Sequence, residues 1–307
     1  MKHAPIALFA FNRPLHIQKT LSALIANPGF LESTVYVFSD GARDSGDEPQ
    51  VDAVRQLVRS LKLSNIKLIE RHSNYGLAKS VISGVSMLCE EFGRVIALED
   101  DLVVAPNFLE FMNDALARYE LDERVMQISG FMFDVKTDLS NTSFFLPIAP
   151  TWGWATWKRA WEKFDPAMTA YEQIEASRKV RRAFDLDNSY PYFRMLERQR
   201  RGETDSWGIR WYLSVFFQRG IILYPAQSLV QNIGFDGSGT HCGFESALGN
   251  AVVERRQGVI TFPEKLEVDE RVLNLVKRYL KRNNSKLARA RIKLKAVLMQ
   301  KLKLKRS

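Results

Sequence analysis

The sequence has little cysteine and no long apolar run. Its 307 residues include two cysteines, Cys89 and Cys242, which excludes a disulfide-stapled scaffold and a four-cysteine zinc site and is typical of a reducing compartment. Nowhere do about 18 consecutive apolar residues occur, so we expect no bilayer-spanning segment. The run Ile6–Phe11 is too short for a secretory signal core and is followed at once by Asn-Arg-Pro. We therefore expect a cytoplasmic protein.

The glycine patterns that bind phosphate groups are also missing. A dinucleotide-binding turn would place G-x-G-x-x-G after the first apolar run, where the sequence has Asn12-Arg13-Pro14-Leu15. The P-loop pattern G-x-x-x-x-G-K-S/T occurs nowhere. A nucleotidyltransferase acting on sugar nucleotides would also need a glycine-rich loop at this point. Any bound phosphate must therefore be held by side-chain cations or by a metal ion.

Short apolar runs alternate with helical patterns over the first hundred residues. Hydrophobic residues make up 46% and charged residues 26% of the chain, which is ordinary for a globular protein with a sizeable core. Apolar runs separated by helices predict an α/β fold with a mostly parallel central sheet. The expected strands are 6–11, 35–39, 66–69 and 95–98, and the expected helices are 14–26, 50–61 and 77–89.

The composition changes twice along the chain. We expect residues 1–126 to form the α/β lobe. In residues 127–268 tryptophans cluster, strands are short and Gly and Pro recur, which predicts an α+β lobe covering the mouth of the first. Residues 269–307 are helical by composition and form the third unit.

Positive charge is concentrated in this third unit. The formal net charge is +9, but residues 277–307 contain 13 Lys or Arg and no Asp or Glu, which leaves −4 for the rest. Apolar side chains fall on one helical face among these cations: Leu287, Ala290, Leu294, Val297 and Leu298. A basic amphipathic helix of this kind predicts binding to an anionic membrane surface. A solvated tail and RNA binding are the alternatives.

Three consecutive carboxylates follow the fourth expected strand. Glu99, Asp100 and Asp101 repel one another unless a cation neutralises them. Ligands of parallel sheets bind beyond the carboxyl ends of the strands, and Mg²⁺ or Mn²⁺ prefers carboxylate and phosphate oxygens. The triplet therefore predicts a metal site, with an acidic turn as the alternative.

Other polar residues follow the remaining strands. Arg13 comes after the first strand, where its guanidinium can fork onto a phosphate. Lys79 opens the helix after the third strand and is a second candidate cation, as is His241 in a glycine-rich segment. Asp40 ends the second strand and can accept hydrogen bonds from a base or ribose. The alternatives are a surface arginine, a helix-surface lysine, an exposed histidine and a turn aspartate.

These residues resemble a known group of enzymes. The segment Val95–Phe108, with its Glu-Asp-Asp, apolar stretch and Ala-Pro, resembles the metal motif of GT-A-fold glycosyltransferases, and most closely that of the N-acetylglucosaminyltransferase I-like enzymes and their bacterial relatives. The glycine-tryptophan segment Pro150–Trp161 and the stretch from Tyr224 to His241 are similar to later parts of that family. The resemblance covers residues 5–245. It implies a GT-A (Rossmann-like) fold with a nucleotide-sugar-binding lobe and an acceptor-side lobe.

The resemblance also implies roles for individual residues. Asp101 matches the direct metal ligand, and Asp100 matches a neighbour that reaches the ribose or sugar of the donor. Arg13 matches a contact to the diphosphate, and Asp40 a contact to the nucleotide base. His241 is expected on the diphosphate or the metal.

Asp205 is the candidate catalytic base. It lies where the family places that base, just before a tryptophan, although this chain has Ser206 where the family has a second aspartate. An inverting transfer needs such a group to take the proton of the acceptor hydroxyl. Trp207, Trp211 and Val215 recur at helical spacing behind it, so the alternative is that Asp205 caps a helix.

Four tryptophans lie close together in the glycine-tryptophan segment. Trp157 and Trp161 are four residues apart and are expected in the core, whereas Trp152 and Trp154 flank Gly153. Exposed indole faces stack on sugar rings. We therefore expect Trp152 and Trp154 in the acceptor-binding cleft.

Together these features predict a metal-dependent inverting glycosyltransferase. We expect Mn²⁺ or Mg²⁺ as cofactor, a UDP-sugar as donor, and a glycan or lipid-linked acceptor used in cell-surface polysaccharide synthesis. The tail would hold the protein peripherally on the inner membrane face, and no nucleic acid is expected as a partner. A non-catalytic GT-A-like binding protein and a nucleic-acid binder using its basic tail are the alternative functions.

Overall fold

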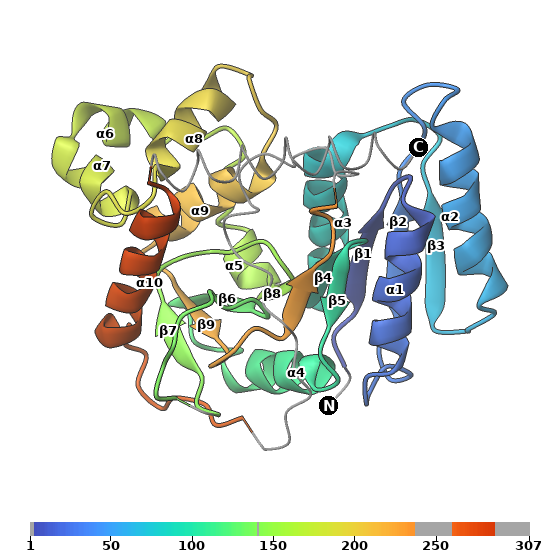
Figure 1. Cartoon of the computed structure of the whole chain (residues 1–307), viewed down its shortest axis with the longest axis horizontal. Helices are drawn as coiled ribbons and strands as arrows, with labels where there is room; N and C mark the ends of the chain where they lie inside the picture. The colour runs from blue at the N-terminus through green and yellow to red at the C-terminus, as the bar shows by residue number, and fades with distance from the viewer. Residues whose placement is uncertain (1–2, 140, 237–259, 286–307) are drawn as a thin grey trace, which may run out of the picture.

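The computed structural model describes residues 3–139, 141–236 and 260–285 (Figure 1). The first third consists of alternating strands and helices: β1 (Ile6–Ala10), α1 (Pro14–Ile25), β2 (Val35–Ser39), α2 (Glu48–Ser60), β3 (Ile66–Glu70), α3 (Gly76–Phe92) and β4 (Arg94–Glu99). All seven elements lie within three residues of the expected bounds. Strands β1, β2 and β4 are almost wholly buried, which explains why they are continuous apolar runs.

The rest of the chain has shorter strands and a group of helices. Its elements are β5 (Leu102–Val104), α4 (Phe108–Arg118), β6 (Val125–Ser129), β7 (Phe144–Leu146), β8 (Trp154–Trp157), α5 (Lys158–Trp161), α6 (Tyr171–Ala176), α7 (Arg178–Phe184), α8 (Tyr192–Arg200), α9 (Trp207–Phe217), β9 (Ile221–Tyr224), β10 (Val230–Asn232) and α10 (Glu270–Asn283). Helices α6 to α8 lie together at one end of the molecule, beside α10 (Figure 1).

One sheet of eight strands runs through the described residues, in the order β3-β2-β1-β4-β8-β6-β9-β7. Strands β1 to β4 are parallel, which confirms the predicted α/β fold with a mostly parallel sheet. Strand β8 is antiparallel to both of its neighbours, β4 and β6. The expected lobes 1–126 and 127–268 therefore contribute strands to one sheet and share one core. That residues 1–126 bind the donor and residues 127–268 the acceptor stays a prediction.

The strand order reverses between β1 and β4. The chain passes outward from β1 to β2 and β3, and then returns to place β4 on the other side of β1. Right-handed crossovers put α1 and α2 on one face of the sheet and α3 on the other. Helix α3 packs closely, since a Cβ at Gly84 would overlap the rings of Phe9 and Phe38. A switch of this kind leaves a crevice beyond the carboxyl ends of β1 and β4.

Helix α10 begins the unit that was expected to be a basic helical tail. Asp269 caps it by accepting a hydrogen bond from the backbone N–H of Val272. Five side chains of α10 are buried against the body: Val272, Leu273, Val276, Tyr279 and Leu280. The apolar face expected over Leu287–Leu298 lies outside the described residues. No helix in the described part of the chain is both long and apolar enough to cross a membrane.

Candidate active site

An acidic pair and an arginine meet beyond the carboxyl ends of β1 and β4. Asp100 and Asp101 directly follow β4, and Arg13 lies three residues beyond the end of β1. The backbone carbonyl of Asp100 accepts a hydrogen bond from Thr20 Oγ1 at 2.8 Å. That of Asp101 accepts one from the N–H of Ile233 at 2.9 Å. Both aspartates are therefore fixed through their backbone, one from α1 and one from the segment after β10.

The guanidinium of Arg13 bridges the two carboxylates. Its Nη2 donates to Asp100 Oδ1 and lies 3.0 Å from Asp101 Oδ2. Asp100 is 3% exposed and Asp101 7%, so this contact neutralises carboxylates that water scarcely reaches. Burial raises the pKa of Asp100 above its usual range, although Arg13 opposes the rise. Burial lowers the pKa of Arg13, but Asp100 and Asp101 more than reverse that effect.

Asp101 has one oxygen without a partner. Its Oδ1 is buried and receives no hydrogen bond within the described part of the chain. A buried carboxylate oxygen in this condition is costly unless a cation or donor reaches it. Gly234 lies directly against the other oxygen, where a Cβ would overlap Asp101 Oδ2. Glycine at this position leaves the carboxylate its space.

The carboxylate oxygens present here fit a divalent metal ion whose remaining coordination positions are filled by water and substrate. Among the residues the structure describes, no three His, Cys, Asp or Glu side chains gather into a ready-made metal cage. Mg²⁺ and Mn²⁺ typically take one or two protein carboxylates and fill the remaining positions with water and substrate phosphates. Asp101 Oδ1 is the protein oxygen best placed for that contact. Its role as metal ligand stays a prediction.

Asp40 joins the loops that follow β2 and β3. The side chain is 6% exposed, and its two oxygens accept three backbone hydrogen bonds, from Gly41 at 3.0 Å, Tyr75 at 2.8 Å and Gly76 at 2.9 Å. Gly41 leaves no room for a side chain, since a Cβ there would overlap the backbone of Ser73. Asp40 thus positions the start of α3, and its contact to a nucleotide base stays a prediction.

Two cations flank one aromatic ring at this edge of the sheet. Lys79 Nζ and the guanidinium carbon of Arg71 each lie 4.1 Å from the ring centroid of Tyr75. Arg71 also donates to Ser83 Oγ at 2.8 Å, while its buried Nε has no hydrogen-bond partner in the described residues. Our sequence predictions missed Arg71. The signal was present, because Arg71 directly follows β3 just as Asp40 follows β2.

The tryptophans expected to face an acceptor are buried. Trp154 is 2% exposed and stacks on Trp207, with ring centroids 5.0 Å apart. The expectation that Trp154 offers an open indole face is wrong, because β8 lies inside the sheet and carries its side chains into the core. Trp152 is 6% exposed and contacts Phe131 and Phe235. It lies closer to the crevice, where its contact with an acceptor stays a prediction.

Asp205 lies just before α9, with its side chain exposed. Its Oδ1 accepts a hydrogen bond from Arg210 Nη2 at 2.8 Å. The N-cap of α9 is Ser206, whose Oγ accepts from the N–H of Ile209. The alternative that Asp205 is the helix cap is therefore wrong. Its role as catalytic base stays a prediction.

The start of α9 lies at the same end of the sheet as the acidic pair. Trp154 pairs with Ala97 near the carboxyl end of β4, and the residues just before Trp154 continue beyond it. One of these, Thr151, lies against α9, since a Cβ at Gly208 would overlap Thr151 Cγ2. Asp205 and Asp101 thus belong to segments that converge on one end of the sheet.

The segment after β10 covers part of the crevice. Strand β10 pairs with β5, after which Ile233 and Gly234 contact Asp101 and the ring of Phe235 packs on Trp152. Asp236 Oδ2 lies 3.2 Å from His16 Nε2 on α1. This segment leads directly to the predicted donor-binding residue His241, which lies outside the described residues.

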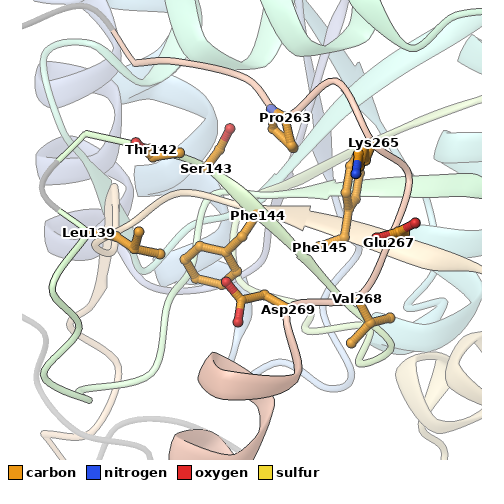
Figure 2. Close-up of a pocket in the computed structure, with 10 residues that line it drawn as sticks. All are labelled: Leu139, Thr142, Ser143, Phe144, Phe145, Pro263, Lys265, Glu267, Val268 and Asp269. Carbon is orange, nitrogen blue, oxygen red and sulfur yellow. The ribbon is translucent and has the colours of Figure 1, made fainter.

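A separate hollow lies at the far edge of the sheet (Figure 2). Two isolated bridges, Thr142 to Thr261 and Phe145 to Val268, join β7 and the residues just before it to the segment before α10. Between the bridges the segment before α10 has more residues than the β7 side, so the two cannot stay paired throughout. Strand β7 is separated from β4 by β9, β6 and β8, so the hollow is remote from the acidic pair. Its lining residues are Leu139, Thr142, Ser143, Phe144, Phe145, Pro263, Lys265, Glu267, Val268 and Asp269.

Fold and crevice define a GT-A-type glycosyltransferase, which uses a nucleotide-sugar donor. Residues 6–164 match the family model described as glycosyl transferase family 2, and this chain belongs to that family. The match begins at β1 and includes Arg13, Asp40 and the acidic pair. No curated protein sequence matches the chain. The closer resemblance to the N-acetylglucosaminyltransferase I-like enzymes stays a prediction.

Several solved structures are similar in part. A mannosyltransferase from Pyrobaculum calidifontis, PcManGT, in complex with GDP-Man and Mn²⁺, is 12% identical, with a TM-score of 0.40 over 71% of this chain and 70% of that one. The galactosyltransferase LgtC, in complex with donor and acceptor sugar analogues, is 10% identical, with a TM-score of 0.34 over 57% and 65%. Residues 1–349 of S. aureus TarS are 14% identical, with a TM-score of 0.31 over 45% and 39%. The chain spans less than two thirds of the last two.

Proposed function

We propose that this glycosyltransferase is metal-dependent and inverting, and that it moves a sugar from a nucleoside diphosphate to a hydroxyl of a glycan or lipid-linked acceptor. The single observation that carries the metal requirement is the buried, unpartnered Oδ1 of Asp101 in the switch-point crevice. A cation-binding carboxylate at this position suits a diphosphate leaving group, because no glycine-rich loop follows β1 to bind it.

The donor would lie across the carboxyl ends of β1, β2 and β4. Asp101 would hold Mn²⁺ or Mg²⁺, which when bound stabilises the negative charge that develops on the departing diphosphate. Arg13, whose guanidinium already lies in the crevice, would contact the same phosphates, and Asp100 the ribose or sugar. Asp40 and Lys79 would line the nucleoside end, with Arg71 beside them. A UDP-sugar is the donor that we propose.

Asp205 would take the proton of the acceptor hydroxyl as its oxygen attacks the anomeric carbon. Arg210, which donates to Asp205 at 2.8 Å, would orient the carboxylate for this step. Attack on the face opposite the diphosphate inverts the anomeric centre. The acceptor would enter near Trp152.

We also propose that the reaction takes place at a membrane surface. The basic residues 277–307 would hold the enzyme on an anionic membrane surface at the inner face. A lipid-linked or growing glycan would be available there. This arrangement suits an enzyme of cell-surface polysaccharide synthesis.

Hydrolysis of the donor in the absence of an acceptor tests the reaction class. Wild-type protein is screened against UDP- and GDP-sugars with Mn²⁺, Mg²⁺ or EDTA, alongside Asp101→Asn and Asp205→Asn. We expect metal-dependent release of nucleoside diphosphate from at least one donor and its loss in Asp101→Asn. Asp52→Asn is the matched control, because Asp52 is an exposed carboxylate of α2, the helix that connects β2 and β3 on the opposite side of β1 from β4.

Two results together would overturn this function. They are the absence of turnover of every donor and the absence of metal-dependent nucleotide binding. The non-catalytic GT-A-like binding protein would then be the better description. Turnover that survives EDTA and Asp101→Asn would contradict the metal requirement and leave the transfer itself standing.

A further inference from the structure

Arg13 shares the carboxylate of Asp101 with the proposed metal site. Its Nη2 lies 3.0 Å from Asp101 Oδ2 and also bonds Asp100. Without this guanidinium two nearly buried carboxylates would face each other with no counter-charge. The N–H of Phe11 also donates to this pair, at 3.4 Å from Asp100 Oδ2.

We propose, on the basis of the metal site proposed above, that Arg13 is an internal counter-cation that competes with the metal for Asp101 until a diphosphate binds. In the ligand-free protein Arg13 neutralises the pair. When a metal-bound diphosphate enters, Arg13 releases Asp101 and turns to the phosphate oxygens. Arg13 therefore makes binding of the metal depend on binding of the nucleotide.

The surrounding contacts permit the side chain alone to move. The carbonyl of Arg13 accepts hydrogen bonds from the N–H groups of His16 and Ile17 at 3.1 Å, which fixes its backbone at the start of α1. Thr20 and Ile233 fix the backbone of the two aspartates. The side chain of Arg13 is 18% exposed, and within the described residues its guanidinium pairs with the two carboxylates. A change of rotamer would carry the partly exposed guanidinium away from Asp101 without moving the backbone.

Electrostatics makes the two cations exclude each other. A divalent ion on Asp101 would lie within a few ångströms of the guanidinium, and like charges at that range repel strongly where water is scarce. Gly234 leaves space beside both Asp101 and Arg13, since a Cβ there would lie 3.1 Å from Arg13 Nη1. A diphosphate removes the repulsion, because it carries enough negative charge to bind both cations. Metal and nucleotide should then raise each other's affinity, as linkage requires.

The test measures Mn²⁺ binding directly, without turnover. Free Mn²⁺ is followed by electron paramagnetic resonance in titrations of the wild type, Arg13→Gln and Arg13→Lys, each with and without UDP. We expect Arg13→Gln to bind Mn²⁺ about tenfold more tightly than the wild type in the absence of UDP, and UDP to enhance the affinity much less than in the wild type. Arg13→Lys keeps the charge and should stay close to the wild type.

Arg43→Gln is the matched control. Arg43 pairs with Asp47 rather than with Asp100 or Asp101 in the described part of the chain, so its removal changes local charge without releasing Asp101. Thermal unfolding is measured in parallel, because Arg13→Gln leaves two carboxylates uncompensated. Mn²⁺ should raise the melting temperature of Arg13→Gln more than that of the wild type.

The opposite outcome is equally clear. If Arg13→Gln is folded and binds Mn²⁺ as the wild type does, or more weakly, Arg13 does not compete with the metal and the inference is wrong. Asp101→Asn separates this failure from that of the metal site. If Mn²⁺ binding survives Asp101→Asn, the proposed metal ligand itself is wrong, whatever Arg13→Gln does.

Discussion

Asp40 and Asp101 both come after a buried parallel strand, yet their carboxylates have different surroundings. Asp40 accepts three backbone hydrogen bonds, whereas Asp101 keeps one buried oxygen without a donor. The first arrangement is that of a residue that holds two loops together. The second leaves one carboxylate oxygen available to a cation or a hydrogen-bond donor. Position at a strand end identified both aspartates, and only the contacts distinguish them.

Asp40→Asn should therefore destabilise the fold as well as weaken nucleotide binding. An asparagine can place its oxygen toward Gly41 and Tyr75, but its NH₂ group would then meet the N–H of Gly76. We expect a loss of about 2 kcal/mol in the free energy of unfolding, as for a buried donor left unsatisfied. Urea denaturation measures it.

Asp44→Asn is the comparison for this substitution. Asp44 accepts one turn hydrogen bond from Gly46 and is exposed, so a change within about 0.5 kcal/mol is expected. If Asp40→Asn proved as stable as Asp44→Asn, the loop-tying role of Asp40 would be refuted.

At the scale of elements, the two residues that precede α9 make different contacts. Ser206 caps the helix, and Asp205 points outward to Arg210. The sequence shows Thr-Asp-Ser-Trp before a helical pattern, and either Asp or Ser is a good N-cap. Residue type alone could not assign the cap, because the choice depends on which side chain the local backbone turns toward the N–H of Ile209.

The two roles predict opposite effects of two substitutions. Ser206→Ala should cost about 1 kcal/mol of stability and change turnover little. Asp205→Asn should leave stability nearly unchanged, since the side chain is exposed, and lower kcat about 100-fold or more for a catalytic base. Thermal unfolding and transfer assays on the same preparations give both quantities. A fall in stability without a fall in kcat for Asp205→Asn would contradict the role of base.

The bounds and partners of some strands could be predicted from the sequence, and those of others could not. Strands β1, β2 and β4 are largely apolar runs and β3 carries Ile66, Leu68 and Ile69; all four adjoin helices, so both their bounds and their parallel pairing could be predicted. Strands β8 and β10 have four and three residues, too few to show a period. Their partners, β4 and β5, lie far back in the chain. The burial of Trp154 follows from that pairing and could not be inferred from the residues around it.

At the scale of the whole molecule, charge is divided between a body of formal charge −4 and a C-terminal segment of +13. The structure changes where that division should be tested. Residues 277–283 belong to α10, where Tyr279 and Leu280 are buried, and Lys277 Nζ lies 2.9 Å from Asp187 Oδ2. A deletion that begins at residue 277 would remove part of the core.

Deletion of residues 286–307 is the cleaner experiment. It removes nine Lys or Arg and leaves α10 whole. We expect loss of sedimentation with anionic phosphatidylglycerol vesicles, because each cation near such a surface contributes about 1 kcal/mol. Donor hydrolysis and melting temperature should be retained.

Neutral phosphatidylcholine vesicles and high salt are the controls. Binding of the full chain to neutral vesicles, or sedimentation of the shortened chain with anionic ones, would contradict electrostatic anchoring by the tail.

The place of β8 in the sheet has a consequence for engineering. Because β8 lies between β4 and β6, the part of the chain that follows residue 126 supplies a central strand to the part that precedes it. Donor and acceptor preferences therefore cannot be recombined by exchanging halves between relatives at that boundary. In such a chimera, strands from two different parent proteins would have to pair in the β4–β8 and β5–β10 ladders. New specificities are better sought in the segments that emerge from the sheet at the crevice.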